Sequence, residues 1–342
     1  MPRVLLKVET AGPLTTIQDG GRPGYRRYGV PPSGPVDRLG FAAAQARVGN
    51  GRGDPALEIS HGGLRLSCVE GEVGFALGGS GFIGAVGLAK VNSGILRAGM
   101  TLSITQNGQG NWAYLALGGQ LQTRRWLGSA ATHALAELGG GRVAAGRILE
   151  VMTPDGQVAA SSQNRAETPS KISEVRIILG PQERFFPDSA VNALCCEPFA
   201  ASARFDRMGM VLDGPALVPN SLDMLSEPAV RGALQVNGTG QLTMLLADHQ
   251  TTGGYPKIAV VIGPDIDRVA QLSPGSPIRF VSISAGQAVA IARKNRAEKE
   301  AYLASLRDVS SLAERLMNRN LVDGMVDGLT DGSADTGPAD LT

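Results

Sequence analysis

Residues 64–77 read LRLSCVEGEVGFAL and show a pattern that repeats through the chain. Two apolar runs, 64–69 and 73–77, lie on either side of a turn that contains Gly71. Similar short runs, separated by glycine-rich turns, occur at 4–8, 113–117 and 175–179. Strands of about five residues at such regular spacing are typical of all-β barrels and sandwiches. The sequence therefore predicts a mainly β protein.

Length and charge limit the class of protein. The chain has 342 residues, enough for two domains, and 43% of them are hydrophobic, enough to build a core for each. A net charge of +1, from 32 basic and 31 acidic residues, disfavours nucleic acid and anionic membranes as partners. No run approaches the roughly 20 apolar residues that span a bilayer, and the opening MPRVLLK breaks off too early for a signal peptide. We expect a cytoplasmic protein.

A recurring turn suggests two β domains in tandem. A glycine followed by a strand pattern occurs at Gly99, Gly146 and Gly275, and the last two turns would each close a domain. Residues 155–173 are polar and nearly free of large apolar side chains, as in a linker, which places a boundary near Pro169. The expected parts are a β-barrel-like domain over 1–168, a second β-barrel over 169–292, and a helical extension with a disordered acidic tail over 293–342.

Few helices are predicted, and most are short. One covers 37–48, with Asp37 as its N-cap, and another covers 187–194. A third begins at Ser284, where Gln287 completes a capping box.

The three cysteines do not indicate a metal site. Cys68, Cys195 and Cys196 show no CxxC spacing, and no nearby histidine completes a tetrahedral set. Since free cysteines are usually interior, we expect reduced, buried thiols and no bound metal.

Residues 16–37, TIQDGGRPGYRRYGVPPSGPVD, form the first candidate functional segment. They gather charged, amide, hydroxyl and phenol groups among glycines and prolines. This composition is unsuited to a buried strand or a regular helix, so we expect a long loop of fixed shape. Loops of this length in compact domains are usually functional, although a plain surface connection is the alternative.

Residues 248–257, DHQTTGGYPK, form the second candidate segment and follow an apolar strand at 242–247. The pair Gly253 and Gly254 would let the backbone approach a ligand closely, and it would equally serve a hairpin turn. A turn alone does not explain the surrounding donors and acceptors, so we favour a binding site.

These two segments, with shorter motifs in the same order over about residues 3–290, resemble the KipA family. This family is also called the C subunit of bacterial 5-oxoprolinase, allophanate hydrolase subunit 2 or the biotin-dependent carboxyltransferase-like family. The resemblance implies two tandem cyclophilin-like β-barrel domains. The shorter motifs are ALEI at 56–59, YLALGG at 114–119, LGSAAT at 127–132, LGPQ at 179–182, DRMG at 206–209 and GALQV at 232–236.

One motif departs from the family pattern. Relatives commonly carry Thr-Gly-Ala-Asp where this chain has GGSG at 78–81, so a carboxylate is missing. We expect Gly81 to relax a turn, with a changed substrate as the alternative.

Candidate site residues come from both predicted domains and would meet across a cleft between them. Asp248, Lys257 and Asp19 are the catalytic candidates, and a carboxylate among them or Glu227 could act as general base. Arg22, Arg207 and Lys257 could bind a carboxylate or phosphate, and Arg207 is expected to form a structural ion pair with Asp206. The substrate-binding candidates are Gln18, Arg22, Ser33, Asp37, Glu227, Gln235, Gln250, Thr252, Gly253, Gly254 and Tyr255.

Function follows from the resemblance together with missing motifs. The chain has no Walker A, GxSxG, HExxH or biotinyl MKM sequence, which favours one component of a complex over a self-sufficient enzyme. The resemblance implies the C subunit of an ATP-dependent 5-oxoprolinase, which makes glutamate from 5-oxoproline, with partners that are the A-type and the B-type (KipI-like) subunits. ATP, with which Mg²⁺ is compatible, would act at the level of the complex. The alternatives are the carboxyltransferase component of a urea-type carboxylase, using carboxybiotin from a partner, and a non-catalytic KipA-like antagonist of a kinase inhibitor.

Overall fold

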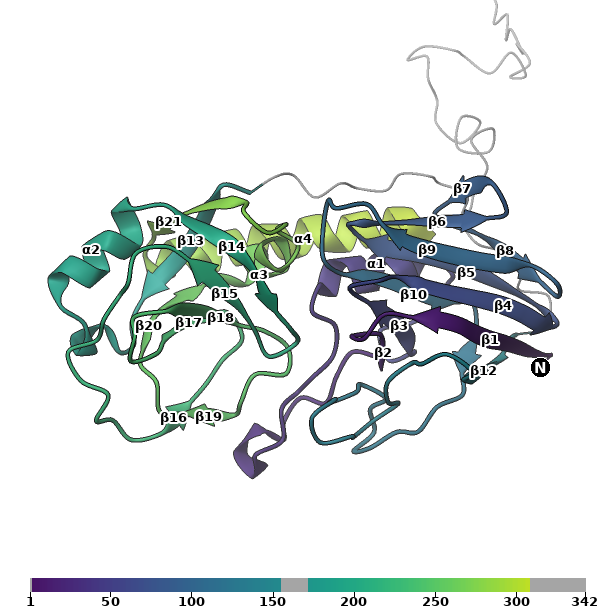
Figure 1. Ribbon diagram of the computed structural model, residues 1–342, viewed down its shortest axis with the longest axis horizontal. Helices are drawn as coiled ribbons and strands as arrows, with labels where there is room; N and C mark the ends of the chain where they lie inside the picture. Colours follow the sequence, from purple (N-terminus) through teal and green to yellow (C-terminus); the bar gives the residue numbers. More distant parts are fainter. Residues whose placement is uncertain (1, 155–171, 308–342) are drawn as a thin grey trace, which may run out of the picture. The chain divides into compact units, whose positions relative to one another are not determined.

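The computed structural model describes residues 2–154 and 172–307 (Figure 1). The predicted acidic tail and nearly all of the predicted linker, including Pro169, lie outside these ranges, so the domain division stays a prediction. Within them the chain is mainly β, which confirms the predicted fold class. No helix in these ranges is both long enough and apolar enough to cross a membrane.

The first half, residues 2–154, is built from two sheets. Its strands are β1 (Arg3–Ala11), β2 (Thr16–Gln18), β3 (Ala56–Ile59), β4 (Leu64–Glu70), β5 (Glu72–Gly79), β6 (Phe82–Val86), β7 (Ala89–Val91), β8 (Ser93–Arg97), β9 (Thr101–Gln106), β10 (Ala113–Leu117), β11 (Gln120–Leu121) and β12 (Ile148–Met152). The order in one sheet is β11-β12-β1-β4-β9-β6-β7, and in the other it is β2-β3-β10-β5-β8.

Residues 64–77 form β4 and β5, as predicted, but the two strands belong to different sheets. β4 pairs with β1 and β9, whereas β5 pairs with β10 and β8. Gly71 takes a φ of +79° in the turn between them, and a Cβ there would lie 2.9 Å from the carbonyl oxygen of Arg3. Leu66 and Phe75 are both buried in the core that the two sheets share.

The second half, residues 172–307, contains a closed barrel with the order β13-β20-β17-β18-β15-β14-β21. Its strands are β13 (Glu174–Leu179), β14 (Phe199–Phe205), β15 (Gly209–Asp213), β17 (Ala233–Val236), β18 (Leu242–Leu245), β20 (Lys257–Val261) and β21 (Pro277–Ser282). A separate two-stranded ribbon pairs β16 (Glu227–Pro228) with β19 (Thr252–Gly253).

The three predicted turn glycines all adopt the left-handed conformation. The φ values are +86° at Gly99, +85° at Gly146 and +81° at Gly275. A strand begins two residues after each of them, namely β9, β12 and β21. This confirms the predicted turns, because only glycine takes such a φ without strain.

Four α-helices occur in the described residues: α1 (Arg38–Arg47), α2 (Asp188–Cys196), α3 (Gly263–Ala270) and α4 (Ala285–Arg307). Asp37 caps α1, and reciprocal hydrogen bonds between Ser284 and Gln287 form the predicted capping box of α4. The α3 helix was not predicted, whereas α4 begins directly after Ser284, as the capping box predicts.

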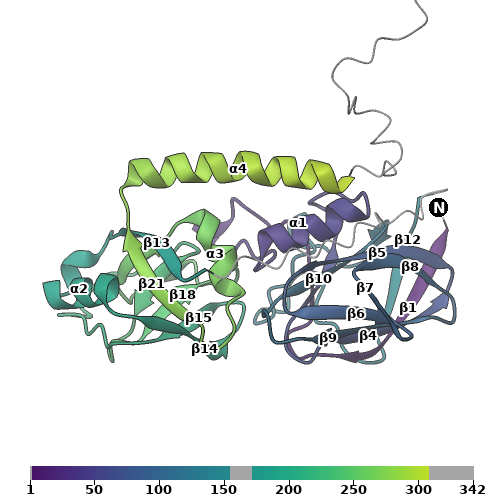
Figure 2. The ribbon, with the colours of Figure 1, turned by 90° about the horizontal axis from the view of Figure 1, so that it is seen from above.

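Helix α4 links the two halves, which belong to one compact unit. It runs past α3 and α1 (Figure 2). Leu303 and Leu306 pack against Ala43 and Ala46 of α1. Helix α4 therefore joins the two halves in addition to carrying charged, solvent-exposed side chains.

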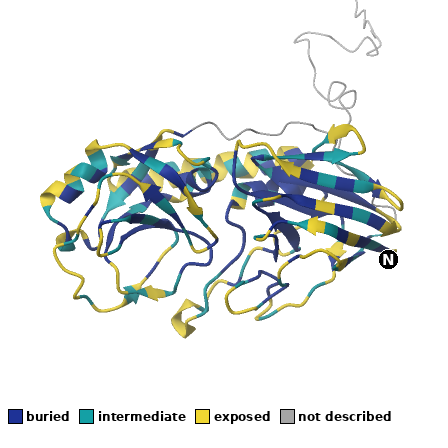
Figure 3. Cartoon of the chain, in the orientation of Figure 1, coloured by how far each residue is buried: buried dark blue, intermediate teal, exposed yellow. Residues whose placement is uncertain are grey.

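The opening loop is partly more regular than its composition suggests. Thr16–Gln18 forms the buried strand β2, which pairs with β3, so the expectation of no strand here is wrong. Polar side chains are tolerated because the amide of Gln18 donates to Thr16 Oγ1 at 3.0 Å and to the Thr132 carbonyl at 3.1 Å. The loop tip, the 3-10 turn Arg26–Tyr28, is exposed, whereas residues 33–37 are buried (Figure 3).

The cysteines differ in exposure. All three are free: Cys68 is buried as expected, Cys195 is half-buried, and Cys196 at the end of α2 is exposed, contrary to expectation. Residues 2–154 and 172–307 contain no group of three or more His, Cys, Asp or Glu side chains that could hold a metal ion.

Candidate active site

Lys257, the first residue of β20, carries a buried ammonium group. The residue is 2% exposed, and its Nζ has no hydrogen-bond partner in the part of the chain that the structure describes. Burial lowers the pKa of the Lys257 ammonium, and the charge of Glu227 offsets part of this effect. Buried polar groups are nearly always hydrogen-bonded. An unpartnered buried ammonium therefore indicates a place where a ligand supplies the acceptor.

A single amide, Gln182, holds Glu227 and Lys257 together. It is fully buried. Its Nε2 donates to Glu227 Oε2, and its Oε1 accepts a hydrogen bond from the backbone N–H of Lys257 at 2.8 Å. Gln182 was not among the predicted site residues. The available signal was its place in the LGPQ motif at 179–182.

Two further amides lie beside Lys257. Gln235 is opposite Lys257 in the pairing of β17 with β20. Gln250 Nε2 donates to Gln235 Oε1 at 2.9 Å, and Gln235 Nε2 donates to the Tyr255 carbonyl at 3.4 Å. A Cβ on Gly253 would lie 3.1 Å from both amide nitrogens, so a larger residue would disturb this pair. The structure thus gathers several of the predicted substrate-binding residues.

Residues 248–257 do not close a hairpin, so that alternative is wrong. The flanking strands β18 and β20 are separated in the barrel by β17, and Gly253 belongs to β19, which pairs with β16. Gln235, Gln250 and Tyr255 line a pocket of about 490 Å³, whereas Thr252 is exposed. A small molecule can therefore reach this segment.

Asp248, at the other end of the segment, belongs to a buried ion cluster. Arg207 donates from Nε and Nη2 to the two carboxylate oxygens of Asp248, at 2.8 and 3.0 Å. It also donates to Glu58 and to the Gly34 carbonyl. Burial alone would lower the pKa of Arg207, but Asp248 and Glu58 together raise it. Both carboxylate oxygens of Asp248 are engaged by Arg207, which favours a structural role, and its catalytic role stays a prediction.

The partners of Arg207 also correct a second prediction. Asp206 does not pair with its neighbour Arg207; its carboxylate accepts from the backbone N–H groups of Met208 and Gly209 at 2.7 and 3.1 Å. The turn at 206–209 thus engages the Asp206 carboxylate, and Arg207 pairs instead with Glu58 of the first half.

Asp19 organises the opening loop. Its carboxylate accepts from Ser129 Oγ and from the backbone N–H of Ala130, both at 2.6 Å, and from the N–H of Gly21 at 2.9 Å. Arg125 adds an ion pair at 3.5 Å. These donors fix the loop around Asp19, and its predicted role as a base stays a prediction.

Arg22 keeps unused hydrogen-bonding capacity in a buried position. The residue is 2% exposed, one of its Nη groups donates to the Ala131 carbonyl, and the guanidinium lies over Trp126. Nε and Nη1 have no partner among the described residues. Burial lowers the pKa of Arg22, an effect that Asp19 and Asp248 partly offset. Arg22 therefore stays a candidate for binding an anion.

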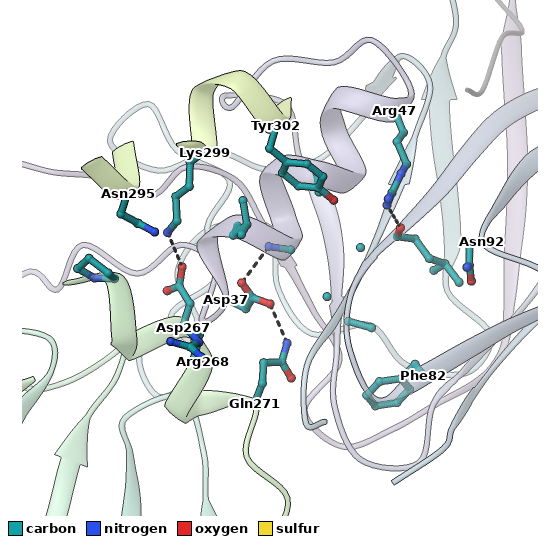
Figure 4. A pocket seen from close by; sticks show the side chains of 18 residues that line it. Asp37, Arg47, Phe82, Asn92, Asp267, Arg268, Gln271, Asn295, Lys299 and Tyr302 are labelled. Carbon is teal, nitrogen blue, oxygen red and sulfur yellow. Dashed lines mark hydrogen bonds and ion pairs between the residues drawn. The ribbon is translucent and has the colours of Figure 1, made fainter. Parts of the chain in front are cut away.

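Asp37 joins the two halves beneath α4 (Figure 4). Its Oδ1 accepts from the N–H of Gly40 at 2.9 Å, and its Oδ2 accepts from Gln271 Nε2 at 2.8 Å. Burial and the nearby carboxylate of Asp267 raise the pKa of Asp37 to about 6. Both carboxylate oxygens of Asp37 already have partners within the protein. Its substrate-binding role stays a prediction.

The GGSG departure at 78–81 has a structural reason. A Cβ on Gly78 would lie 2.0 Å from the Gly40 carbonyl oxygen, so α1 packs directly on β5. Gly81 takes a φ of +85°, in agreement with the expected turn. The segment serves close packing in this chain.

The structure brings two groups of the predicted residues together. The first surrounds Lys257, with Glu227, Gln235, Gln250 and Gly253. The second surrounds the Arg207 cluster. Contacts that cross between the halves include Arg207 with Glu58 and Gln271 with Asp37, and of these four residues Glu58 and Gln271 were not predicted as site residues.

Comparison with known proteins identifies the family. The family described as carboxyltransferase domain, subdomain A and B, matches residues 28–282, a range that includes the second part of the opening loop and the whole closed barrel. The chain belongs to this family, which confirms the resemblance seen in the sequence.

Individual relatives extend the match. The chain is 32% identical over 324 residues to the C subunit of 5-oxoprolinase from Escherichia coli (strain K12), covering 92% of this chain and 100% of the relative. It is 33% identical to the solved structure of TTHA0988, with a TM-score of 0.72 over 82% of this chain and 55% of that chain. Urea carboxylase of Kluyveromyces lactis is 25% identical, with a TM-score of 0.78 over 91% of this chain and 30% of that chain. This chain thus spans about half the length of TTHA0988 and under a third of the urea carboxylase.

Proposed function

We propose that this chain is the C subunit of an ATP-dependent 5-oxoprolinase and acts in the cytoplasm with A-type and B-type (KipI-like) partners. The observation that carries the proposal is the 32% identity over the whole length of the E. coli relative. Because the chain has no known nucleotide motif, we expect turnover only from the complex.

The residues around Lys257 suit a cyclic amide that bears a carboxylate, as 5-oxoproline does. The Lys257 ammonium would bind the substrate carboxylate, or the oxygen that gains negative charge as the ring opens. Glu227, held by Gln182, would accept the lactam N–H, and the amide groups of Gln235 and Gln250 would face the rest of the ring. The support is the free Nζ of Lys257 and the fixed carboxylate of Glu227.

ATP would make the stable lactam reactive. Transfer of its γ-phosphoryl group to the amide oxygen would release ADP. Attack of water on the ring carbon would then break the ring C–N bond and give a γ-glutamyl phosphate, and a second water would release phosphate and leave glutamate. Arg22 offers free donors for a phosphoryl oxygen, and Mg²⁺ would accompany the nucleotide in the complex.

A second function, the carboxyltransferase component of a urea-type carboxylase, is favoured by the TM-score of 0.78 to K. lactis urea carboxylase. In that reaction carboxybiotin would come from a partner, and Lys257 would stabilise charge on the transferred carboxyl group. A non-catalytic, KipA-like antagonist of a kinase inhibitor would need no such site.

Reconstitution with the partner proteins tests the proposal. The three subunits together should convert 5-oxoproline and ATP to glutamate, ADP and phosphate, and omission of any one of them should abolish the reaction. Carboxylation of urea from labelled bicarbonate with a biotin carboxylase partner, without glutamate formation, would select the second function. Turnover by this chain alone would contradict its role as one component of a complex.

A further inference from the structure

A cationic cleft of about 1100 Å³ lies beneath α4, and none of the residues that would contact 5-oxoproline in the proposed reaction lines it. We call it the α4 cleft; the opening loop, α1, α3 and α4 all contribute to its lining. Basic side chains outnumber carboxylates in the lining by five to two. They are Arg38, Arg52, Arg231, Arg296 and Lys299, against Asp267 and Glu300.

Both carboxylates are already neutralised inside the protein. Asp267 accepts from Arg231 at 2.7 Å and from Lys299 at 3.4 Å, and Glu300 is likewise paired with the basic residue one helical turn before it. Arg38, in contrast, forms no hydrogen bond or ion pair with any described residue. Burial and the like charge of Arg231 lower the pKa of Arg38, and Asp267 only partly offsets this. The α4 cleft therefore holds surplus positive charge.

Two buried donors in the same cleft have no acceptor. Ser33 is 5% exposed, and its Oγ has no partner within the described residues. The side chain of Arg231 is 10% exposed, and its Nε is likewise unpartnered. Buried polar atoms are nearly always hydrogen-bonded, so these donors indicate a ligand that brings several acceptor oxygens.

We propose that the α4 cleft binds the phosphate groups of a nucleotide. Ser33, Arg38 and Arg231 would hold the phosphate oxygens, because guanidinium groups match phosphate in a bidentate geometry. A neighbouring apolar wall that includes Phe41, Val260 and Ile266 would pack against the base. The volume is sufficient for a molecule of this size.

The phosphate end of the α4 cleft is joined to the Asp248 cluster. Ser33 precedes Gly34, whose carbonyl oxygen accepts from Arg207 at 2.8 Å. A ligand in the cleft would therefore act, through Ser33 and Gly34, on the cluster that fixes one end of the segment 248–257. The choice of ATP as the nucleotide rests on the proposed 5-oxoprolinase function, whereas the location of the phosphate site does not.

Calorimetric titration of the full-length chain tests this inference with three probes: MgATP, inorganic tripolyphosphate and adenosine. The expected result is saturable binding of MgATP, weaker binding of tripolyphosphate and none of adenosine. Arg38→Gln and Ser33→Ala should each weaken MgATP binding about tenfold, since each removes a hydrogen bond to charged oxygen. Arg97→Gln, which removes the same charge from an exposed pair with Glu72, is the matched control and should bind as the wild type does.

Absence of MgATP and tripolyphosphate binding at millimolar concentration would overturn the inference, as would equal affinities in Arg38→Gln and Arg97→Gln. Equal binding of tripolyphosphate and MgATP would overturn the nucleotide assignment. Failure here is separable from failure of the proposed function, because the titration needs neither turnover nor a partner protein.

Discussion

Asp248 and Lys257, at the two ends of the segment 248–257, are 4% and 2% exposed, yet they bury their charges in opposite ways. Asp248 has both oxygens on Arg207, which also holds Glu58 of the first half. Lys257 Nζ has no hydrogen bond to any residue that the structure describes. A buried charge with complete partners is required by the fold, whereas one with free capacity is placed for a ligand. Burial and charge alone therefore do not identify a catalytic group.

Arg207→Met should produce the largest effect, a loss of about 3–5 kcal/mol in the free energy of unfolding. The substitution leaves Glu58 and Asp248 buried without their cation. Urea denaturation of the full chain measures this loss. Arg204→Met is the matched control, because the exposed pair of Arg204 with Asp213 should contribute less than about 1 kcal/mol. Similar stabilities of the two variants would show that the Arg207 cluster is not structural.

Asp37 should give the fold a pH dependence of about 3 kcal/mol. Its pKa is raised from 3.8 to about 6 by burial and by Asp267, so the folded state holds the proton more tightly than the unfolded state does. The resulting stabilisation is fully present below pH 3.8 and is lost as the pH rises through about 6.

Urea denaturation of the wild type and of Asp37→Asn from pH 3.5 to 7.5 measures this contribution. The difference in stability between the two proteins cancels the contributions of groups that titrate in the same way in both. Asp267 interacts with Asp37 and does not cancel in this way; burial would raise its pKa, but Arg231 and Lys299 outweigh burial and lower it, so Asp267 titrates below the range expected for Asp37. The stability of the wild type relative to Asp37→Asn should fall between about pH 4 and 6. A difference that does not vary with pH would contradict the raised pKa of Asp37.

Gln182→Met should have a smaller effect, a loss of about 1–2 kcal/mol in stability with a rate decrease of about tenfold. The substitution keeps the side-chain volume but leaves the N–H of Lys257 and the carboxylate of Glu227 without their shared amide. Unfolding curves and the rate of glutamate formation by the complex measure the two effects. A loss of stability with an unchanged rate would assign Gln182 to the fold alone.

Local features of this fold could be predicted from the sequence, and features set by distant partners could not. Gly99, Gly146 and Gly275 and the cap at Asp37 depend on a few adjacent residues, and the structure confirms them. The assignment of β4 and β5 to separate sheets depends on pairing with strands elsewhere in the chain.

The same limit applies to the candidate site. The polar composition of 248–257 pointed to a segment that the structure places beside Lys257 and Gln235, but the role of Asp248 depends on Arg207, 41 residues away. Gln182 was missed because the backbone that it holds, at Lys257, lies 75 residues away in the sequence. Glu58 lies in the strand motif ALEI. The pattern of that motif does not reveal that the partner of Glu58 is a buried arginine.

The most direct test of this account is the rate and the melting temperature of the reconstituted complex with Lys257→Met. Methionine replaces the ammonium at similar bulk, so the melting temperature should stay the same or rise, because an unpaired buried charge is removed. The rate of glutamate formation should fall about a hundredfold, since the group that meets substrate charge is gone. Lys90→Met, at an exposed position in β7, is the control and should change neither quantity. A rate within about threefold of the wild type for Lys257→Met would contradict the assignment of Lys257 to the site.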